Sequence, residues 1–545
     1  MNHTKYQQEP ILNFPQRTWP DKRPQKAPIW CSVDLRDGNQ SLENPMTLEQ
    51  KLEFFEFLVK TGFKEIEVGF PAASDTEFQF VRTLIEKKLI PDDVAIQVLT
   101  PSREPLIRRT FEALAGVSCG IVHLYNATNP LHRDVVFQKS KEETKALALE
   151  GAKLLCALAD EYGRDRFVFQ YSPECFSQTE PDFSIEVCNA VISCWKNHRI
   201  ILNLPFTVET AMPNVHADMI EYVCGRLNNR EKVIVSLHAH NDRGTGVAAT
   251  ELCLLAGADR VEGTLFGNGE RTGNADIITV AMNLYAQGID PGLDFSDIDN
   301  AIEVYNKYTG MPVHPRHPYA GELVYTAFSG SHQDAIRKGM ARMKKEKGPW
   351  VMPYLPIDPA DVGRSYAPLI RVNSQSGAAA SAYILETNYG MMVPKQMQRD
   401  FGPLVTDLSD TRGAELSPDD IYKLFSDTYI NKNAPADLIN WAESKEGETS
   451  LVTGEINWHK DKKYIEGRGD GVLEAFCQSL IDATGISFDI KHYSQHALES
   501  GREARAITYV GISNAGGGIV FGAGISRNIT TSSIKAVISA LNRTI

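Results

Sequence analysis

The chain has 545 residues, too many for one ordinary domain, so we expect two or three. Apolar residues make up 42% of it, and the formal charge of −13 disfavours nucleic acid or an anionic membrane surface as a partner. The nine cysteines include no C-x-x-C pair, the first residues form no basic-then-apolar leader, and no apolar run is long enough to span a bilayer. These features predict a cytoplasmic protein with reduced thiols.

Residues 1–28 carry five prolines and predict an extended N-terminal arm. After the arm, short apolar runs alternate with segments of helical periodicity, the first of which begins at a capping box, Thr47–Gln50. The strand-like runs are 29–34, 65–70, 95–100, 121–126, 167–172, 200–205, 233–240 and 260–267. Eight strands alternating with helices over about 250 residues predict a (β/α)₈ TIM barrel, which we place at 29–330. A doubly wound open sheet is the alternative, but it usually has fewer strands.

The pattern changes after the predicted barrel. Helical stretches around a proline-rich run predict linker subdomains over 331–430, and the polar stretch 431–449 is interpreted as a linker. Residues 450–545 predict an α+β domain in which two strands, a glycine turn and a helix occur twice, with Gly522–Gly524 as the second turn. The expected fold class is α/β, with a TIM barrel followed by helical linker subdomains and a C-terminal α+β domain.

Two histidines, His238 and His240, lie at the end of the predicted seventh strand. Because side chains alternate along a strand, both imidazoles point to the same side. A single histidine in such a place is usually a hydrogen-bonded core residue. Two of them at the end of an apolar strand favour a metal site.

Reactive groups of a barrel collect at the C-terminal ends of its strands. Asp37 follows the first strand and Asn274 follows the eighth, and strands one, seven and eight are neighbours in a closed barrel. Either residue alone would more often cap a helix or serve a turn. Together with His238 and His240 they predict an open site for a catalytic zinc, manganese or magnesium ion, since no cysteine belongs to the set.

Several stretches of the chain resemble a known family. Those in the predicted barrel are 33–40 (VDLRDGNQ), 67–71 (EVGFP), 238–244 (HAHNDRG) and 267–274 (GNGERTGN). They are similar to the Claisen-condensing acyl-CoA synthases, which include the 2-isopropylmalate, homocitrate and citramalate synthases. The likeness to the longer 2-isopropylmalate synthases covers essentially the whole chain. Residues 450–545 resemble the leucine-responsive domain of those enzymes. Three further stretches, 330–335, 355–359 and 372–377, resemble their subdomains.

The resemblance implies an acyltransferase of leucine biosynthesis. Its reaction would join acetyl-CoA, 3-methyl-2-oxobutanoate and water into (2S)-2-isopropylmalate and CoA, with a divalent metal (Mg²⁺, Mn²⁺ or Zn²⁺) as cofactor. A homodimer and feedback inhibition by leucine are implied as well. Citramalate or homocitrate synthase is the alternative within the family. A catalytically silent leucine sensor is a further alternative, and a metal-dependent hydrolase fits less well because few carboxylates are present to bridge two metals.

The resemblance also implies roles at the metal. Asp37, His238 and His240 would bind the ion, and Asn274 would join them directly or through water. A 2-oxo acid offers a carboxylate and a ketone oxygen as a chelating pair, so such an ion would polarise the ketone. Arg36, beside Asp37, would stabilise the negative charge that develops on oxygen.

A base must remove a proton from the acetyl methyl group. The resemblance implies Glu174 paired with His332, with Tyr354 in the same site, and leaves open whether the last two act in their own chain or in a partner. A purely structural Glu174 is the alternative. Seven residues would line the substrate pocket: Arg36, Leu99, His123, Ser172, Asn203, Pro205 and Thr207. They offer no extra basic group for a second carboxylate, which disfavours homocitrate synthase.

Overall fold

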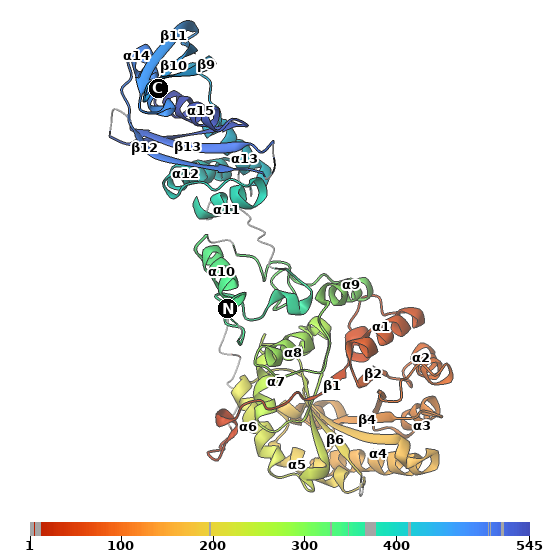
Figure 1. Cartoon of the computed structure of the whole chain (residues 1–545). Helices are drawn as coiled ribbons and strands as arrows, with labels where there is room; N and C mark the ends of the chain where they lie inside the picture. Colours follow the sequence, from red (N-terminus) through yellow and green to blue (C-terminus); the bar gives the residue numbers. More distant parts are fainter. Residues whose placement is uncertain are drawn as a thin grey trace. The chain divides into compact units, whose positions relative to one another are not determined.

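The computed structural model (Figure 1) divides into two compact units. The first comprises Met1–Val324 with Asp358–Ser365, and the second comprises Tyr325–Ile357 with Tyr366–Ile545. The residues that the structure describes are 5, 12–195, 198–327, 330–346, 348–365, 378–412, 416–499, 501, 503–513 and 517–545. The family-like stretch 372–377 lies outside them. Within these ranges, no helix has the length and apolar character needed to cross a membrane.

The first unit contains a closed barrel of eight parallel strands, each paired with the next in sequence, with β8 paired back to β1. The strands are β1 Ile29–Ser32, β2 Glu65–Gly69, β3 Ala95–Pro101, β4 Gly120–Ala127, β5 Phe167–Glu174, β6 Ile200–Phe206, β7 Val233–Ala239 and β8 Arg260–Gly263. The predicted TIM barrel is confirmed, because an open doubly wound sheet has no such closing pair. Both β1 and β8 end earlier than predicted, since the residues that follow form tight helical turns.

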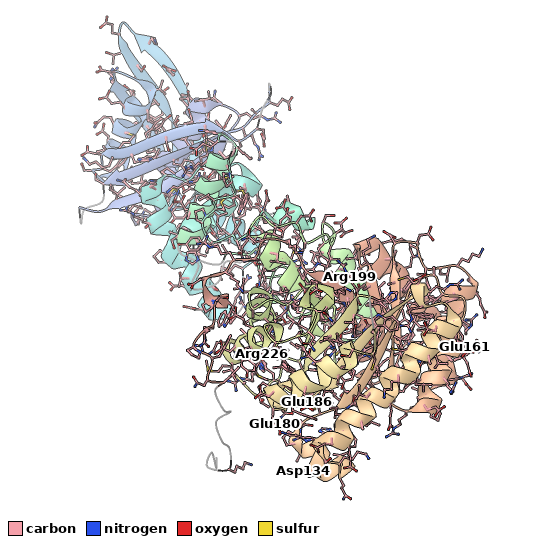
Figure 2. The ribbon with its side chains drawn as sticks, turned by 90° about the horizontal axis from the view of Figure 1, so that it is seen from below. Asp134, Glu161, Glu180, Glu186, Arg199 and Arg226 are labelled. Atoms are coloured by element: carbon pink, nitrogen blue, oxygen red, sulfur yellow. The ribbon has the colours of Figure 1, made fainter. Side chains whose placement is uncertain are left out.

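A helix follows every strand and packs on the outside of the barrel (Figure 1). The helices are α1 Leu48–Thr61, α2 Asp75–Glu86, α3 Glu104–Leu114, α4 Lys141–Tyr162, α5 Pro181–Ile192, α6 Pro213–Cys224, α7 Gly246–Leu255 and α8 Ile277–Tyr285, with α9 Ile298–Thr309 after them. The predicted capping box of α1 is present, and Gly62 ends that helix at a φ of 111°. Charged side chains such as Glu161 of α4 and Glu186 of α5 are exposed on the outer surface (Figure 2).

Part of the predicted N-terminal arm packs against the barrel. Trp19, in a short 3₁₀ turn, is buried and donates its indole N–H to Asp218 of α6 at 2.8 Å. Arg17 pairs with the same carboxylate at 2.7 Å, and the backbone N–H of Thr18 donates to Glu221 at 2.7 Å. These contacts fix residues 17–19 on one barrel helix.

Among its described residues, the second unit contains four helices and then a repeated pattern of three strands and one helix. The helices are α10 Gly330–Met343, α11 Ala378–Tyr389, α12 Lys395–Arg412 and α13 Pro418–Tyr429. The first repeat is β9 Ala436–Glu446, β10 Thr449–Trp458, β11 Asp461–Gly469 and α14 Val472–Thr484; the second is β12 Ile490–Ala497, β13 Ala506–Ser513, β14 Ile519–Ser526 and α15 Ile529–Asn542. Each set of strands forms an antiparallel sheet with its middle strand in the centre.

Two predictions for this unit are wrong. The expected linker 431–449 contains β9, which pairs along its length with β10. This strand lies at a sheet edge and is mostly exposed. Its many polar side chains therefore gave no apolar pattern that would predict a strand. Gly522 and Gly524 form no turn, because they lie inside β14, where α15 packs closely: a Cβ on Gly524 would lie 2.0 Å from the carbonyl oxygen of Ser532.

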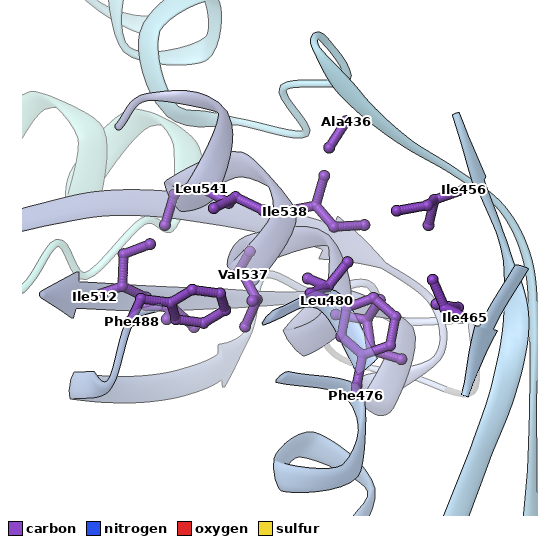
Figure 3. Close-up of a cluster of buried hydrophobic side chains, with 14 of the residues drawn as sticks. Ala436, Ile456, Ile465, Phe476, Leu480, Phe488, Ile512, Val537, Ile538 and Leu541 are labelled. Carbon is purple, nitrogen blue, oxygen red and sulfur yellow. The ribbon is translucent and has the colours of Figure 1, made fainter. Parts of the chain in front are cut away.

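Two hydrophobic cores meet on the sheet of the second repeat. On one face, Val510 and Ile512 of β13 join a core that includes both repeats (Figure 3). On the other face, Ile507 and Tyr509 of the same strand join a core formed with α11, α12 and α13. Strand β13 is therefore buried on both faces and connects the C-terminal repeats to the helices that precede them.

Candidate metal centre and active site

The four residues predicted to bind a metal come together at the C-terminal end of the barrel strands. Asp37 lies in a π-helical turn, Asp34–Gly38, directly after β1, while His238 is in β7 and His240 follows it. The ligand atoms of these three residues all lie within 4.8 Å of one another. Oδ2 of Asp37 lies 3.6 Å from Nε2 of His238 and 3.8 Å from Nε2 of His240, and all three side chains are buried.

Asn274 completes the group from the loop after β8. Its side-chain amide donates to Oδ2 of Asp37 at 2.7 Å and to the carbonyl oxygen of Asn268 at 2.9 Å, and its backbone bridges to His240. Its Oδ1 is buried and has no hydrogen-bond partner among the described residues. A buried acceptor of this kind is normally satisfied, so the free oxygen marks a place where a water or ion fits.

The donor set fits a divalent ion. Ligand atoms about 2.0–2.2 Å from one ion lie about 3–3.5 Å from each other, close to the separations of 3.6 and 3.8 Å found here. Two imidazole nitrogens with carboxylate and amide oxygens suit zinc, manganese or magnesium. Nδ1 of His238 lies 2.9 Å from Oε2 of Glu262, and because a carboxylate only accepts, Nδ1 donates and leaves Nε2 free to bind a metal.

The charges of the group differ from one residue to the next. Burial lowers the pKa of His238, but the Asp37 and Glu262 carboxylates outweigh it and raise that pKa to about 9 in the metal-free chain. Burial and the charge of His238 lower the pKa of His240 to about 4. Burial would raise the pKa of Asp37, but the Arg36 guanidinium holds it well below its usual range.

Arg36 is held between two carboxylates. Its Nη1 donates to Oδ1 of Asp37 at 2.8 Å, and its Nε donates to Oε2 of Glu67 at 2.5 Å. Burial lowers the pKa of the guanidinium, but Glu67 and Asp37 outweigh it and hold that pKa above its usual value. The arginine is therefore charged and fixed in one direction beside the predicted metal ligands.

A cavity of about 300 Å³ opens at this point. Its walls include all seven predicted substrate-binding residues, together with Asp37, Glu174, His238 and His240. The other lining residues are Gln40, Phe70, Tyr125, Glu270 and Arg271. The sequence patterns assigned no role to these five, which belong to the ends of strands or to the loops after them.

Hydrogen bonds fix the polar wall of the cavity. Nδ1 of His123 donates to the Glu67 carboxylate at 2.8 Å, so its Nε2 accepts from the hydroxyl of Ser172 at 2.6 Å. Asn203 donates to the same hydroxyl oxygen at 3.0 Å, and Thr207 accepts from the backbone N–H of Cys175 at 2.9 Å. The polar groups on this wall therefore point in defined directions before any ligand binds.

Glu174, the predicted base, lies at the end of β5 and lines the cavity. Burial raises the pKa of its carboxyl group above the usual value, against the smaller opposing effects of His132 and Arg36. A carboxylate with a raised pKa in a cavity has the properties of a general base.

His332 and Tyr354 belong to the second unit. Their rings stack, with centroids 4.0 Å apart and planes at 26°, and Tyr354 is 62% exposed with a φ of 64°. The structure thus brings these two residues together, on a surface of their own unit. Their pairing with Glu174 stays a prediction.

A layer of polar residues inside the barrel was missed from the sequence. It consists of Glu67, Gln97, Gln170, Arg260 and Glu262, all fully or almost fully buried. Each is a polar residue in a mostly apolar strand, for example Gln97 in Ala95–Pro101. A polar residue at an inward-facing position of a buried strand was the signal that could have found them.

Family models and curated relatives match this chain along most of its length. The chain matches the HMGL-like family over residues 27–304, the alpha-isopropylmalate synthase post-catalytic domain-like family over 322–386, and the LeuA allosteric (dimerisation) domain over 415–545. The 2-isopropylmalate synthase of Acetoanaerobium sticklandii is 55% identical, over 100% of this chain and 97% of its own length. Those of Pseudomonas entomophila and Clostridium acetobutylicum are 53% and 51% identical, over 99% and 100% of this chain and 97% and 99% of their own lengths. Together with the barrel and its site, these likenesses confirm the predicted resemblance: the chain belongs to the 2-isopropylmalate synthase family.

Proposed function

We propose that this chain is a metal-dependent 2-isopropylmalate synthase, which condenses acetyl-CoA with 3-methyl-2-oxobutanoate and water to give (2S)-2-isopropylmalate and CoA. The observation that carries the proposal is the grouping of Asp37, His238 and His240 at one wall of the cavity that Arg36 also lines. A 2-oxo acid needs such an arrangement, because its carboxylate and ketone oxygens can share one cation while its alkyl group enters the pocket.

Asp37, His238 and His240 would hold the ion, with Asn274 beside them. A bound divalent ion supplies Lewis-acid polarisation of the ketone. Arg36, which lines the cavity, would stabilise the negative charge that develops on the same oxygen. Removing one well-placed donor of this kind costs about 3–4 kcal/mol of transition-state stabilisation in comparable sites.

Other residues of the cavity wall would bind the rest of the 2-oxo acid. Thr207 and Asn203 present polar groups to its carboxylate end, and Leu99 and Pro205 present apolar surface to its alkyl end. The small Ser172 leaves room for an isopropyl group. One methylene changes binding by only about 1–3 kcal/mol, so the choice between 3-methyl-2-oxobutanoate and pyruvate depends on this wall.

Glu174 takes part in removing the methyl proton of the acetyl group. Its pKa, which burial raises above the usual value of a glutamate, supports this role, because a carboxylate with a raised pKa accepts a proton more readily. His332 and Tyr354 complete the base, from their own chain or from a second copy of the chain. The stacking of their rings, which places the two groups side by side, supports a joint role.

The assembly and regulation follow from the C-terminal repeats. We place a homodimer contact and a leucine-binding site in this part of the chain, which matches the LeuA allosteric (dimerisation) domain. Leucine acts as the feedback inhibitor, and the enzyme works in the cytoplasm. The two βββα repeats support a ligand site at a shared interface, because repeated units present matching surfaces to each other.

A CoA-release assay with purified protein tests the proposal. Pyruvate, 3-methyl-2-oxobutanoate and 2-oxoglutarate are each supplied with acetyl-CoA, with and without Mn²⁺ or Mg²⁺, and with and without leucine. Release that requires metal, prefers 3-methyl-2-oxobutanoate and falls with leucine supports it. Preference for pyruvate would make the chain a citramalate synthase, and no release from any 2-oxo acid would favour a silent leucine sensor.

A further inference from the structure

Glu262, on β8, is paired in register with His238 of β7 and is 1% exposed. One of its oxygens, Oε2, accepts from Nδ1 of His238 at 2.9 Å. The other, Oε1, accepts from Arg260 at 2.8 Å, from Gln97 at 2.9 Å and from Gln170 at 2.7 Å. Four donors thus hold this carboxylate in a single orientation.

The donors around Oε1 are themselves fixed. Arg260 is fully buried and also donates to Glu65 at 2.5 Å, to Ser236 at 2.7 Å and to Oε1 of Gln97 at 2.8 Å. Because the guanidinium and the carboxamide are planar, these bonds leave little freedom for either group to rotate. Glu262 is therefore held by a connected set of side chains on β8 itself and on strands across the barrel.

The two histidines of the centre are supported differently. His238 has the Glu262 carboxylate behind it, whereas Nδ1 of His240 is buried and has no hydrogen-bond partner in the part of the chain that the structure describes. Partners behind metal-binding histidines fix the tautomer and the ring direction, and losing one typically costs about 10- to 100-fold in metal affinity.

We propose that Glu262, held by Arg260, is the positioning residue of the metal centre: it fixes the Nδ1–H tautomer of His238 and aims Nε2 at the ion beside Asp37. This role rests on the proposed function, because it assumes that His238 is a ligand. The carboxylate is required rather than any polar group of its size. In Glu262→Gln, an amide NH₂ would face either the donors around Oε1 or the Nδ1–H of His238.

Mn²⁺ binding to the purified full chain tests this role, with free Mn²⁺ counted by electron paramagnetic resonance. E262Q should bind Mn²⁺ about 10- to 100-fold more weakly than wild type. The matched control is E65Q, which removes another carboxylate from the same arginine; among the described residues, Glu65 forms no hydrogen bond or ion pair with a histidine. E65Q should keep the wild-type affinity within about twofold, even where both variants lose thermal stability.

Unchanged affinity in E262Q, or an equal loss in E262Q and E65Q, would overturn the role and leave the proposed metal centre intact. A wild-type chain that binds no Mn²⁺ would overturn both. If E262Q does not fold, the wild-type enzyme gives a second readout. Labelled with ¹⁵N-histidine and loaded with Zn²⁺, it should show a metal-bound ring whose Nδ1 proton is shifted downfield by a carboxylate; the absence of such a ring would contradict the proposal.

Discussion

The side chain of Asn274 donates a hydrogen bond of 2.7 Å to Oδ2 of Asp37, the same oxygen that faces Nε2 of His238 and of His240. This bond joins the loop after β8 to the π-helical turn after β1, across the pair of strands that closes the barrel. The amide thus holds the carboxylate toward the histidines, while its own oxygen has no hydrogen-bond partner in the described part of the chain.

Changing Asn274 to Asp should therefore make stability depend on metal. Two carboxylates at hydrogen-bond distance repel each other, so metal-free N274D should melt at a lower temperature, by about 4 °C for a loss on the order of 2 kcal/mol. Mn²⁺ should raise the Tm of N274D by more than that of wild type. Thermal scans with EDTA and with Mn²⁺ measure both effects.

Asn283→Asp is the matched control, because Asn283 also donates to a carboxylate, that of Glu251, at 2.9 Å, and neither residue lines the cavity. N283D should lose stability without gaining any response to Mn²⁺. An equal rise in Tm with Mn²⁺ in the two variants would show that the response does not depend on the position of Asn274 beside Asp37.

Replacing Glu174 by Gln should remove the general base and spare the metal. We expect kcat to fall by about 10²- to 10⁴-fold while Mn²⁺ affinity stays the same. Because burial raises the pKa of Glu174, wild-type activity should fall as the pH drops through a value above that of an ordinary glutamate, and E174Q should lack this acid limb. A pH profile of CoA release measures this.

The control for Glu174 is Glu186→Gln on the outer face of α5, labelled in Figure 2, where the side chain is 56% exposed and pairs with Lys145. E186Q should retain both rate and profile. If E174Q kept most of the activity, Glu174 would be structural, and the base would have to be sought in the second unit.

His216 should make the free energy of unfolding of the barrel decrease at acidic pH. It is fully buried on α6 and stacks on Phe206 at 4.1 Å, and burial, with the charge of Arg243, lowers its pKa to about 4. Its stabilising contribution is complete above a pH of about 6.5, the value of an unfolded histidine, and is lost as pH falls from there toward 4. Over that window the loss is about 3 kcal/mol.

His216→Phe should remove this dependence, because phenylalanine keeps the stacked ring and takes up no proton. Urea unfolding at about pH 7.5 and about pH 5, on either side of the ordinary histidine pKa, compares the two proteins. The difference between wild type and H216F should shift in favour of H216F by about 2 kcal/mol at the lower pH. Parallel losses in both proteins would mean that other groups cause the acid sensitivity.

Gly524→Ala should disturb the C-terminal repeats, since the new Cβ would lie 2.0 Å from the carbonyl oxygen of Ser532 on α15. Overpacking of this kind typically costs about 1–3 kcal/mol. Gly348→Ala is the control in the same unit, because a Cβ there meets nothing within 4 Å. Urea unfolding followed by circular dichroism should separate the two variants, and equal midpoints would contradict the close packing of α15 on β14.

The sequence predicted the barrel well because its strands are buried on both sides. Continuous apolar runs mark such strands, and the alternation of side chains along the seventh run is enough to place His238 and His240 on one side. The pattern failed where a strand is polar and exposed, as in β9, and for β12, whose sequence Ile490–Ala497 mixes polar and apolar residues without a clear period. An edge strand is defined by its hydrogen bonds to a neighbour, which periodicity does not reveal.

The sequence predicted those site residues that lie at the end of a barrel strand or in the loop directly after it. Asp37 and Asn274 could be placed because strands one and eight must meet when a barrel closes. The support beneath them could not be placed, because Glu262 and Gln97 are far apart in sequence and are joined only by hydrogen bonds across the barrel. His332 and Tyr354 lie outside the barrel pattern altogether, so periodicity gave them no position.

Strand β13 has a consequence for how this protein can be divided and recombined. Ile507 and Tyr509 complete a core with α11, α12 and α13. Truncating the chain at residue 450 would therefore remove part of this core and expose an aggregation-prone apolar surface on those helices. Helices α11, α12 and α13 and both repeats therefore have to be expressed, or exchanged between proteins, as one segment. Point substitution in the repeats is therefore a better test of the proposed leucine site than truncation.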